Sequence, residues 1–98
     1  MEYETKRVGN ILTLYLKGRL DTLAAKDFDT KIDMMLNGVV TLFLDLKDLV
    51  YTSSSGLRVF AKILDIMEKN GEVIFKNVSP EIRFVFEMTG MLDDITIQ

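Results

Sequence analysis

The sequence predicts one α/β domain, residues 1–98, with a mixed sheet of four or five strands flanked by three or four helices. A chain of 98 residues can bury one modest core and has no room for a second. Along the chain, strand-like segments alternate with segments of helical periodicity. Such alternation implies stacked layers and a partly parallel sheet, while an expected N-terminal hairpin makes the sheet mixed.

Each expected element has its own hydrophobic pattern. The strand-like segments lie at 2–7, 11–17, 39–46, 72–76 and 95–97. The segments with apolar residues on one helical arc lie at 23–36, 56–69 and 80–88. The nearly continuous apolar run at 39–46 is typical of a central strand that is buried on both faces. The polar segment that follows it, 47–55, is expected to be a loop.

Turn and capping residues separate these segments. The pair Gly9-Asn10 is a turn signal between the first two strands and indicates a hairpin. Asp21 or Thr22 is placed to cap the first helix, because short polar side chains accept hydrogen bonds from free N–H groups there. Pro80 follows a serine and is expected at the first position of the third helix.

Composition excludes several kinds of chemistry. The chain has no cysteine, which excludes disulfides, thiol catalysis and thiolate metal sites. It has no histidine, the commonest general base and metal ligand. Lys and Arg total 12 and Asp and Glu 15, and the positive charges are scattered rather than gathered into a stripe. We therefore expect no cofactor, no metal and no direct contact with nucleic acid.

The chain shows no sign of a membrane segment. Its apolar runs are a few residues long, far from the roughly 20 residues of a membrane span. Residues 1–4 lack the basic and apolar regions of a signal peptide. We expect a cytoplasmic protein without a membrane span.

A hydroxyl-rich run at 52–57, Thr-Ser-Ser-Ser-Gly-Leu, separates a buried strand from an apolar helix. One serine of the run is expected to cap the helix, but a cap does not explain three serines and a threonine together. A catalytic serine needs an activating base, and without histidine a Ser-His-Asp arrangement is impossible. Lys62 lies about two turns into the helix, poorly placed to reach back to Ser54. A phosphate acceptor needs only an exposed hydroxyl.

Four segments, in this order, resemble the STAS family (sulfate transporter and anti-sigma factor antagonist), and within it the stand-alone bacterial antagonists. They are Gly-Arg-Leu-Asp at 18–21, Leu-Phe-Leu-Asp-Leu at 42–46, Ser-Ser-Gly-Leu at 54–57 and the segment 78–91. The resemblance covers nearly the whole chain. It implies partner switching: the antagonist binds an anti-sigma factor that is also a serine kinase, and so frees a sigma factor.

The resemblance also implies the regulatory residues. Phosphorylation of the first serine of Ser-Ser-Gly-Leu, Ser54, breaks the complex, and a phosphoserine phosphatase resets it. The family carries an aspartate just before that serine, whereas this chain has Ser53, which makes Ser53 a rival acceptor. The surface expected to bind the partner includes Asp21, Ser53, Ser54, Ser55 and Gly56.

The second helix carries more apolar residues than a helix flanking a sheet usually needs. Val59, Ile63 and Ile66 extend its apolar arc past half of the circumference. Either the third helix covers them or they form part of a partner-binding patch. Asp21 likewise has two interpretations, as a helix cap and as part of the binding and kinase-recognition surface.

Two rival functions remain. The domain could be a STAS subunit or scaffold of a transport or stress-signalling complex that acts by docking without phosphorylation. The serine in place of the family aspartate gives this rival weight. It could also be an enzyme with a serine nucleophile, which the absence of histidine and cysteine disfavours.

Overall fold

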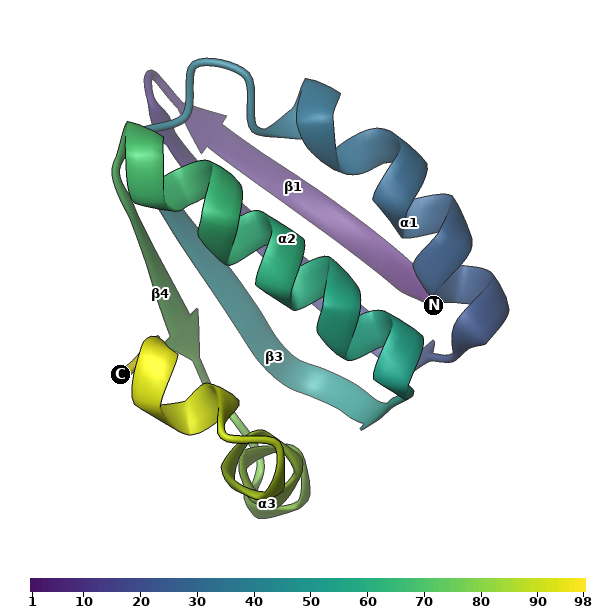
Figure 1. Cartoon of the computed structure of the whole chain (residues 1–98). Coiled ribbons are helices and arrows are strands. Elements are labelled where there is room, and N and C mark those ends of the chain that lie inside the picture. The colour runs from purple at the N-terminus through teal and green to yellow at the C-terminus, as the bar shows by residue number, and fades with distance from the viewer.

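Strands and helices alternate along the chain in the computed structural model, which describes all 98 residues (Figure 1). The strands are β1 (Glu2–Val8), β2 (Ile11–Leu20), β3 (Thr41–Thr52), β4 (Glu72–Lys76) and β5 (Thr96–Ile97). The helices are α1 (Thr22–Met35), α2 (Ser54–Asn70), α3 (Pro80–Met88) and the 3-10 helix η1 (Met91–Asp94). This order confirms the predicted mixed α/β fold, and η1 is the element that the sequence analysis missed.

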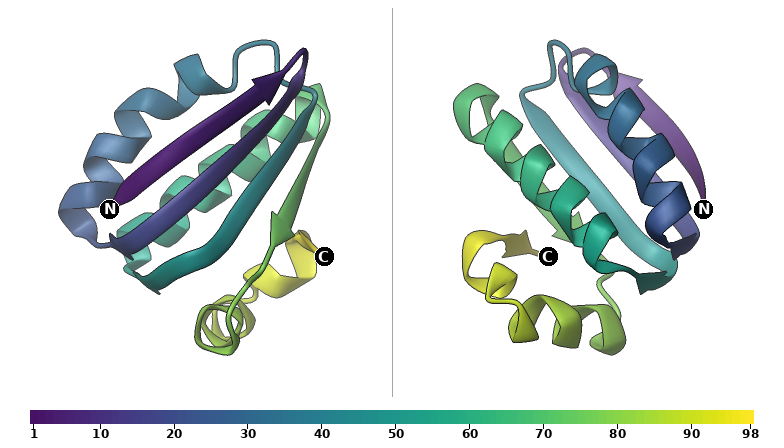
Figure 2. Two further views of the ribbon diagram at one scale, coloured as in Figure 1. Left: turned by 180° about the vertical axis from the view of Figure 1, so that it is seen from behind. Right: turned by 45° about the vertical axis from the view of Figure 1, so that its right-hand side comes forward.

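The strands form one mixed sheet in the order β1-β2-β3-β4-β5. β1 and β2 are the antiparallel hairpin, and the pairs β2–β3, β3–β4 and β4–β5 are parallel. α1 and α2 cover one face of the sheet, while the view from behind shows strands without a helix over them (Figure 2). Because β2 and β3 run in the same direction, their C-terminal ends lie together, next to the starts of α1 and α2.

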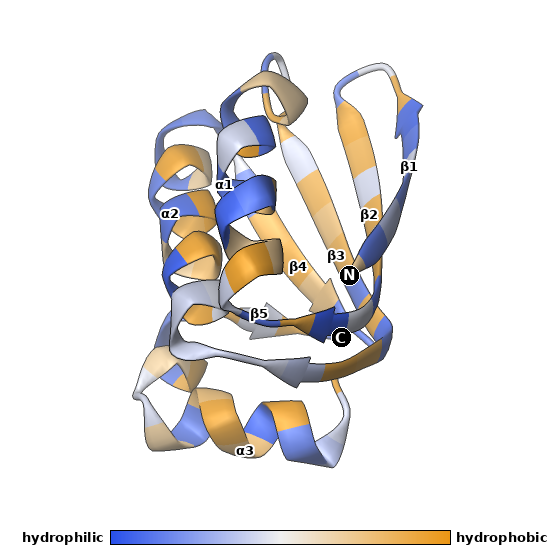
Figure 3. Ribbon diagram, turned by 90° about the vertical axis from the view of Figure 1, so that its right-hand side faces the viewer, coloured by the Kyte–Doolittle hydropathy of each residue, from blue (hydrophilic) through white to orange (hydrophobic).

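The core lies between the sheet and the two covering helices, and Figure 3 shows apolar residues along β2, β3 and β4. Alternating leucines of the two central strands are buried there: Leu12, Leu14, Leu16, Leu42, Leu44 and Leu46. α1 adds Ala25, Phe28 and Ile32. Three buried phenylalanines meet edge to face with ring centroids 5.5 to 5.9 Å apart: Phe60, Phe75 and Phe86. This aromatic cluster joins α2, β4 and α3 into the same core.

β3 is longer than expected, and the predicted loop at 47–55 was wrong except at Ser53: 47–52 belong to β3, and 54–55 begin α2. The strand stays paired with β2 up to Thr52, which lies opposite Leu20, with shifts of register on the way. Leu49 is buried, whereas the preceding Lys47 and Asp48 are exposed. The register shifts interrupt the alternation of a regular strand, and a polar pair at such a shift resembles a loop.

The caps of the helices match their sequence signals. Asp21 rather than its neighbour caps α1, and its Oδ1 accepts a hydrogen bond from the Ala24 N–H at 2.9 Å. The Ser79 hydroxyl accepts from the Ile82 N–H at 3.2 Å, and Pro80 occupies the first position of α3. Each cap satisfies an N–H group that has no partner within the helix.

Candidate functional site

The hydroxyl-rich run lies at the edge of the sheet where β3 ends and α2 begins. Leu20 and Thr52, the last residues of β2 and β3, lie side by side in the parallel pair. The Ser53 N–H donates to the Leu20 carbonyl at 2.9 Å. Asp21 follows directly, so the topology brings the cap of α1 next to the start of α2. These two segments were expected to share one surface, and in the structure they lie together.

Ser53 is the capping serine of the run. Its backbone is extended, and its hydroxyl accepts a hydrogen bond from the Gly56 N–H at 3.1 Å. The same hydroxyl donates to the Leu20 carbonyl at 3.0 Å. The residue is buried, with 9% of its surface exposed. Ser53 therefore has a structural role, because it satisfies the helix and ties it to the end of β2.

Ser54 is the first residue of α2, and it is exposed. It lies at the positive end of the helix dipole, where the first N–H groups have no partner within the helix. Ser55, the next residue, is half-buried and faces the groove described below. Of the three serines, Ser54 is the one whose hydroxyl is most open to another molecule.

Gly56 lets α2 approach the sheet closely at this point. A Cβ built on Gly56 would lie 2.8 Å from the Cγ and Cδ2 atoms of Leu20, and closer still to the Thr52 Oγ1 atom. Real Cβ atoms essentially never come so near another heavy atom. The glycine is thus needed for space, and the first turn of α2 is held against the ends of β2 and β3.

A groove of about 490 Å³, lined by Ser55, lies between the N-terminal halves of α1 and α2. Its lining includes three cations, Lys26, Arg58 and Lys62, and one carboxylate, Asp29. Leu23, in the first turn of α1, also lines the groove and is 78% exposed. This groove was not predictable from the sequence, because it forms only when two helices pack side by side.

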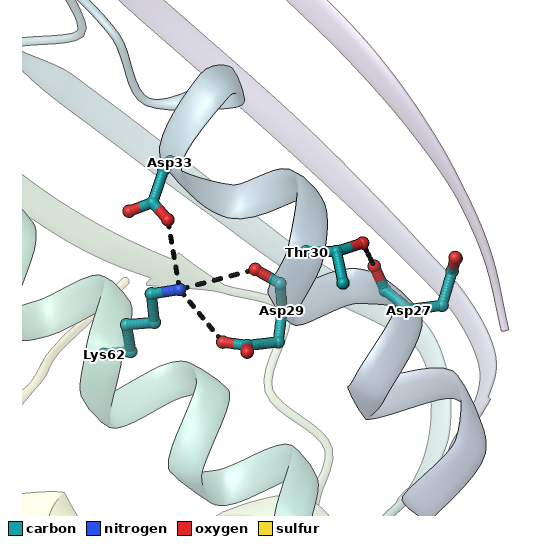
Figure 4. Close-up of polar contacts among 5 residues, drawn as sticks. All are labelled: Asp27, Asp29, Thr30, Asp33 and Lys62. Carbon is teal, nitrogen blue, oxygen red and sulfur yellow. Dashed lines mark hydrogen bonds and ion pairs between the residues drawn. The ribbon is translucent and has the colours of Figure 1, made fainter.

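Lys62 links the two helices, as Figure 4 shows. Its ammonium donates to Asp29 Oδ1 at 3.0 Å and to Asp33 Oδ2 at 3.3 Å. The hydrogen bond to Asp29 raises the pKa of Lys62. The ammonium is thus engaged with two carboxylates of α1, which agrees with the expectation that Lys62 does not activate Ser54.

The expectation that Val59 and Ile63 form an exposed partner-binding patch was wrong. They are 4% and 0% exposed and belong to the core. Ile66 is half-buried against the same core. The covering element is α1, which packs against α2, and not the third helix that the sequence analysis suggested. Hydrophobic periodicity shows how wide an apolar arc is, but it does not show which neighbour covers it.

The described residues contain no group of three His, Cys, Asp or Glu side chains that could hold a metal ion. None of the helices is both long and apolar enough to cross a membrane. The candidate site combines the exposed Ser54 at the N-terminus of α2 with the groove that Ser55 and three cations line.

Fold and site together define a class of small α/β domain that presents a serine at the start of a sheet-covering helix. The chain belongs to the STAS domain family, whose family model matches residues 2–98. This assignment confirms the resemblance drawn from the four sequence segments.

Several characterised proteins are similar to this chain. The anti-sigma-B factor antagonist of Bacillus subtilis strain 168 is 27% identical over 95 residues, which cover 96% of this chain and 87% of that protein. The Bacillus cell fate determinant SpoIIAA, solved in its phosphorylated form, superposes with a TM-score of 0.77 at 23% identity, covering 99% and 91% of the two chains. An anti-sigma factor antagonist from Mycobacterium paratuberculosis superposes with a TM-score of 0.86 at 16% identity, and the match covers 98% of this chain and 83% of that chain. These two structures show that the fold is shared.

Proposed function

We propose that this protein is an anti-sigma factor antagonist that docks to an anti-sigma factor with serine kinase activity and is released when Ser54 is phosphorylated. The observation that carries the proposal is the exposed Ser54 at the N-terminus of α2, directly before Ser55, which lines the groove between α1 and α2. The name and length of the Bacillus subtilis relative support the role. The protein then works by docking, and a phosphoserine phosphatase returns it to the binding form.

The structure favours Ser54 over Ser53 as the phosphate acceptor. Ser53 is a buried residue, 9% exposed, and its hydroxyl already donates to the Leu20 carbonyl. A phosphate on Ser53 would remove that donor and place about two negative charges against a carbonyl oxygen. Ser54 is exposed, so a kinase can reach its hydroxyl without opening the fold.

A phosphate on Ser54 is compatible with the fold but destabilises an interface that buries it. At the start of α2 the helix dipole and the free N–H groups stabilise an anion. The same anion buried under a partner would lose its hydration and meet any acidic or apolar partner surface. Each 1.4 kcal/mol lost at the interface lowers affinity about tenfold, so one phosphate is enough to change partner. The relative SpoIIAA, solved in a phosphorylated form, supports this use of the fold.

We propose that the partner docks on the groove residues and not on the apolar residues of α2, which are buried in the core. Leu23 offers an exposed apolar side chain, and Lys26 and Arg58 offer positive charge in the groove that Ser55 lines. We expect a partner segment with an apolar residue and flanking carboxylates to fit here. Asp21 and Gly56 act through position, because Asp21 caps the start of α1 and Gly56 lets the first turn of α2 lie close to β2 and β3.

The first test is phosphorylation in vitro. The protein is mixed with ATP and its cognate anti-sigma factor, and its intact mass is measured, followed by peptide mapping of 47–58. We expect one added phosphate on Ser54 that is absent from Ser54→Ala and retained by Ser55→Ala. Phosphate on Ser53 instead would support the same mechanism but show that Ser53, and not Ser54, is the acceptor. Absence of phosphate with any cognate kinase would favour docking without phosphorylation.

The second test is the affinity for the anti-sigma factor, measured by isothermal titration calorimetry. We expect Ser54→Asp to weaken binding by about tenfold or more, because it places a charge in the interface. Ser54→Ala, which adds no charge, should bind nearly as the wild type does. Equal affinity of Ser54→Asp and the wild type would contradict a charge-based switch at this residue.

A further inference from the structure

β1 is an edge strand whose outer side is open. It lies at the end of the strand order and pairs with β2 alone. Of its residues only Tyr3 is half-buried and the rest are exposed. Figure 3 shows β1 as mostly hydrophilic at the border of the sheet. None of the backbone hydrogen bonds made outside the helices and strands involves β1. An open edge of this length is able to accept another strand.

The hairpin fixes which backbone groups point outward. Gly9 and Asn10 form a two-residue turn, so the flanking pair Val8–Ile11 exchanges hydrogen bonds. Hydrogen-bonded and non-bonded pairs alternate along an antiparallel ladder. The even-numbered residues of β1 therefore point their N–H and C=O groups toward β2. The odd-numbered residues Tyr3, Thr5 and Arg7 point theirs away from the sheet.

The charges of β1 are arranged in two blocks of opposite sign. Glu2 and Glu4 lie in the first half, and Lys6 and Arg7 in the second. Two antiparallel copies of such a strand bring the acidic half of each against the basic half of the other. Opposite charges facing across two strands stabilise the pair, and like charges destabilise it.

Outward-pointing groups and charge together select one register. Since only the odd residues have free groups, a two-fold pairing must be centred on a residue and not between two residues. The registers that pair most of β1 are centred on Glu4, Thr5 or Lys6. Centring on Glu4 sets two glutamates against each other, and centring on Lys6 sets two lysines. Centring on Thr5 places Glu4 of each copy opposite Lys6 of the other. Charged residues on an edge usually prevent pairing, but here they prevent only the shifted registers.

We infer that two copies of this chain associate antiparallel through β1, centred on Thr5, and join their sheets into one continuous sheet. The pairing is isologous, because the same strand serves both copies. It also stops at two copies, since the opposite edge of the sheet is β5, which has only two residues. The contact is small, so the dimer is weak and depends on concentration.

A charge-swap series tests this pairing in the full chain by sedimentation velocity from micromolar to millimolar concentration. We expect the wild type to shift toward the dimer as concentration rises. Glu4→Lys and Lys6→Glu, which each set like charges face to face, should sediment as monomers. The double variant carrying both changes restores opposite charges and should regain the dimer. A wild type that stays monomeric, or a double variant that does not recover, would overturn the inference.

A proline substitution tests the backbone contact separately. The Thr5 N–H points outward, so Thr5→Pro removes a bond to a second copy and none of the β1–β2 ladder. We expect this variant to be monomeric with a far-ultraviolet circular dichroism spectrum like that of the wild type. Hydrogen exchange should show the Thr5 amide of the wild type protected more at high concentration than at low. A Thr5→Pro variant that still forms the dimer would show that the copies meet elsewhere.

Discussion

Neighbouring serines in the run have different structural roles. Ser53 faces inward, accepts from the Gly56 N–H and donates to the Leu20 carbonyl. Ser54 begins the helix and faces outward. The serine that stabilises the fold is therefore a different residue from the serine proposed to be phosphorylated. Modification of Ser54 leaves both hydrogen bonds of Ser53 in place.

Alanine substitutions should separate these two roles. Ser53→Ala removes an N-cap and the donor to Leu20, and we expect it to lower the free energy of unfolding by about 1 kcal/mol or somewhat more. Ser54→Ala removes an exposed hydroxyl, and the change should stay within about 0.5 kcal/mol. Urea unfolding followed by circular dichroism measures both. Equal losses for the two variants would contradict the division between cap and surface.

Gly56 tests the close approach of α2 to the sheet. Gly56→Ala places a Cβ into the space held by Leu20 and Thr52. In the middle of a helix alanine is usually the better residue by up to about 1 kcal/mol. Here we expect the reverse, a loss of about 1 to 3 kcal/mol, because the site has no room for a methyl group. The measurement is the urea midpoint of Gly56→Ala, compared with that of the wild type. Gly90→Ala does not serve as a control, because Gly90 has a positive φ that disfavours alanine.

At the scale of the elements, local signals in the sequence explain most boundaries. α1 was predictable because Asp21 and a clear apolar arc mark it, and α3 because a serine and Pro80 open it. The end of β3 was not predictable, because its ladder with β2 shifts register where Lys47 and Asp48 are exposed. The strand is held there by its neighbour and not by its own pattern.

The same distinction explains what the sequence did and did not show of the site. The serine run and its place after a buried strand were visible, because they are contiguous. The groove between α1 and α2 was not visible, because Lys62 reaches across it to Asp29 and Asp33 from a distant part of the chain. The burial of Val59 and Ile63 depends on the same helix pairing.

The pairing of α1 and α2 gives a prediction for Ile63. Ile63→Asp buries a carboxylate without a partner at a position that is 0% exposed. We expect a loss of several kcal/mol and a chain that is largely unfolded at 25 °C. Arg58→Asp, an exposed change on the same helix, should leave the fold intact and is the control. A folded Ile63→Asp protein by circular dichroism would show that α1 does not cover this face of α2.

At the scale of the whole molecule, one core joins all the layers. Leucines of β2 and β3 meet α1 and α2 on the covered face of the sheet. The cluster of Phe60, Phe75 and Phe86 extends this core to α3, beyond the edge of the two covering helices. A chain of 98 residues with a single such core is expected to unfold in one cooperative transition.

Phe86 tests that cooperativity. It is 0% exposed, whereas Phe84 on the same helix is 59% exposed. Phe86→Ala removes one ring from the aromatic cluster, and we expect it to cost about 3 to 5 kcal/mol, a large part of the stability of a small domain. Phe84→Ala should change stability by less than about 0.5 kcal/mol. Circular dichroism and tyrosine fluorescence, followed together during urea unfolding, should shift to lower urea in parallel for Phe86→Ala. Loss of α3 alone, with the tyrosine signal of the sheet unchanged, would mean that the C-terminal elements fold apart from the rest.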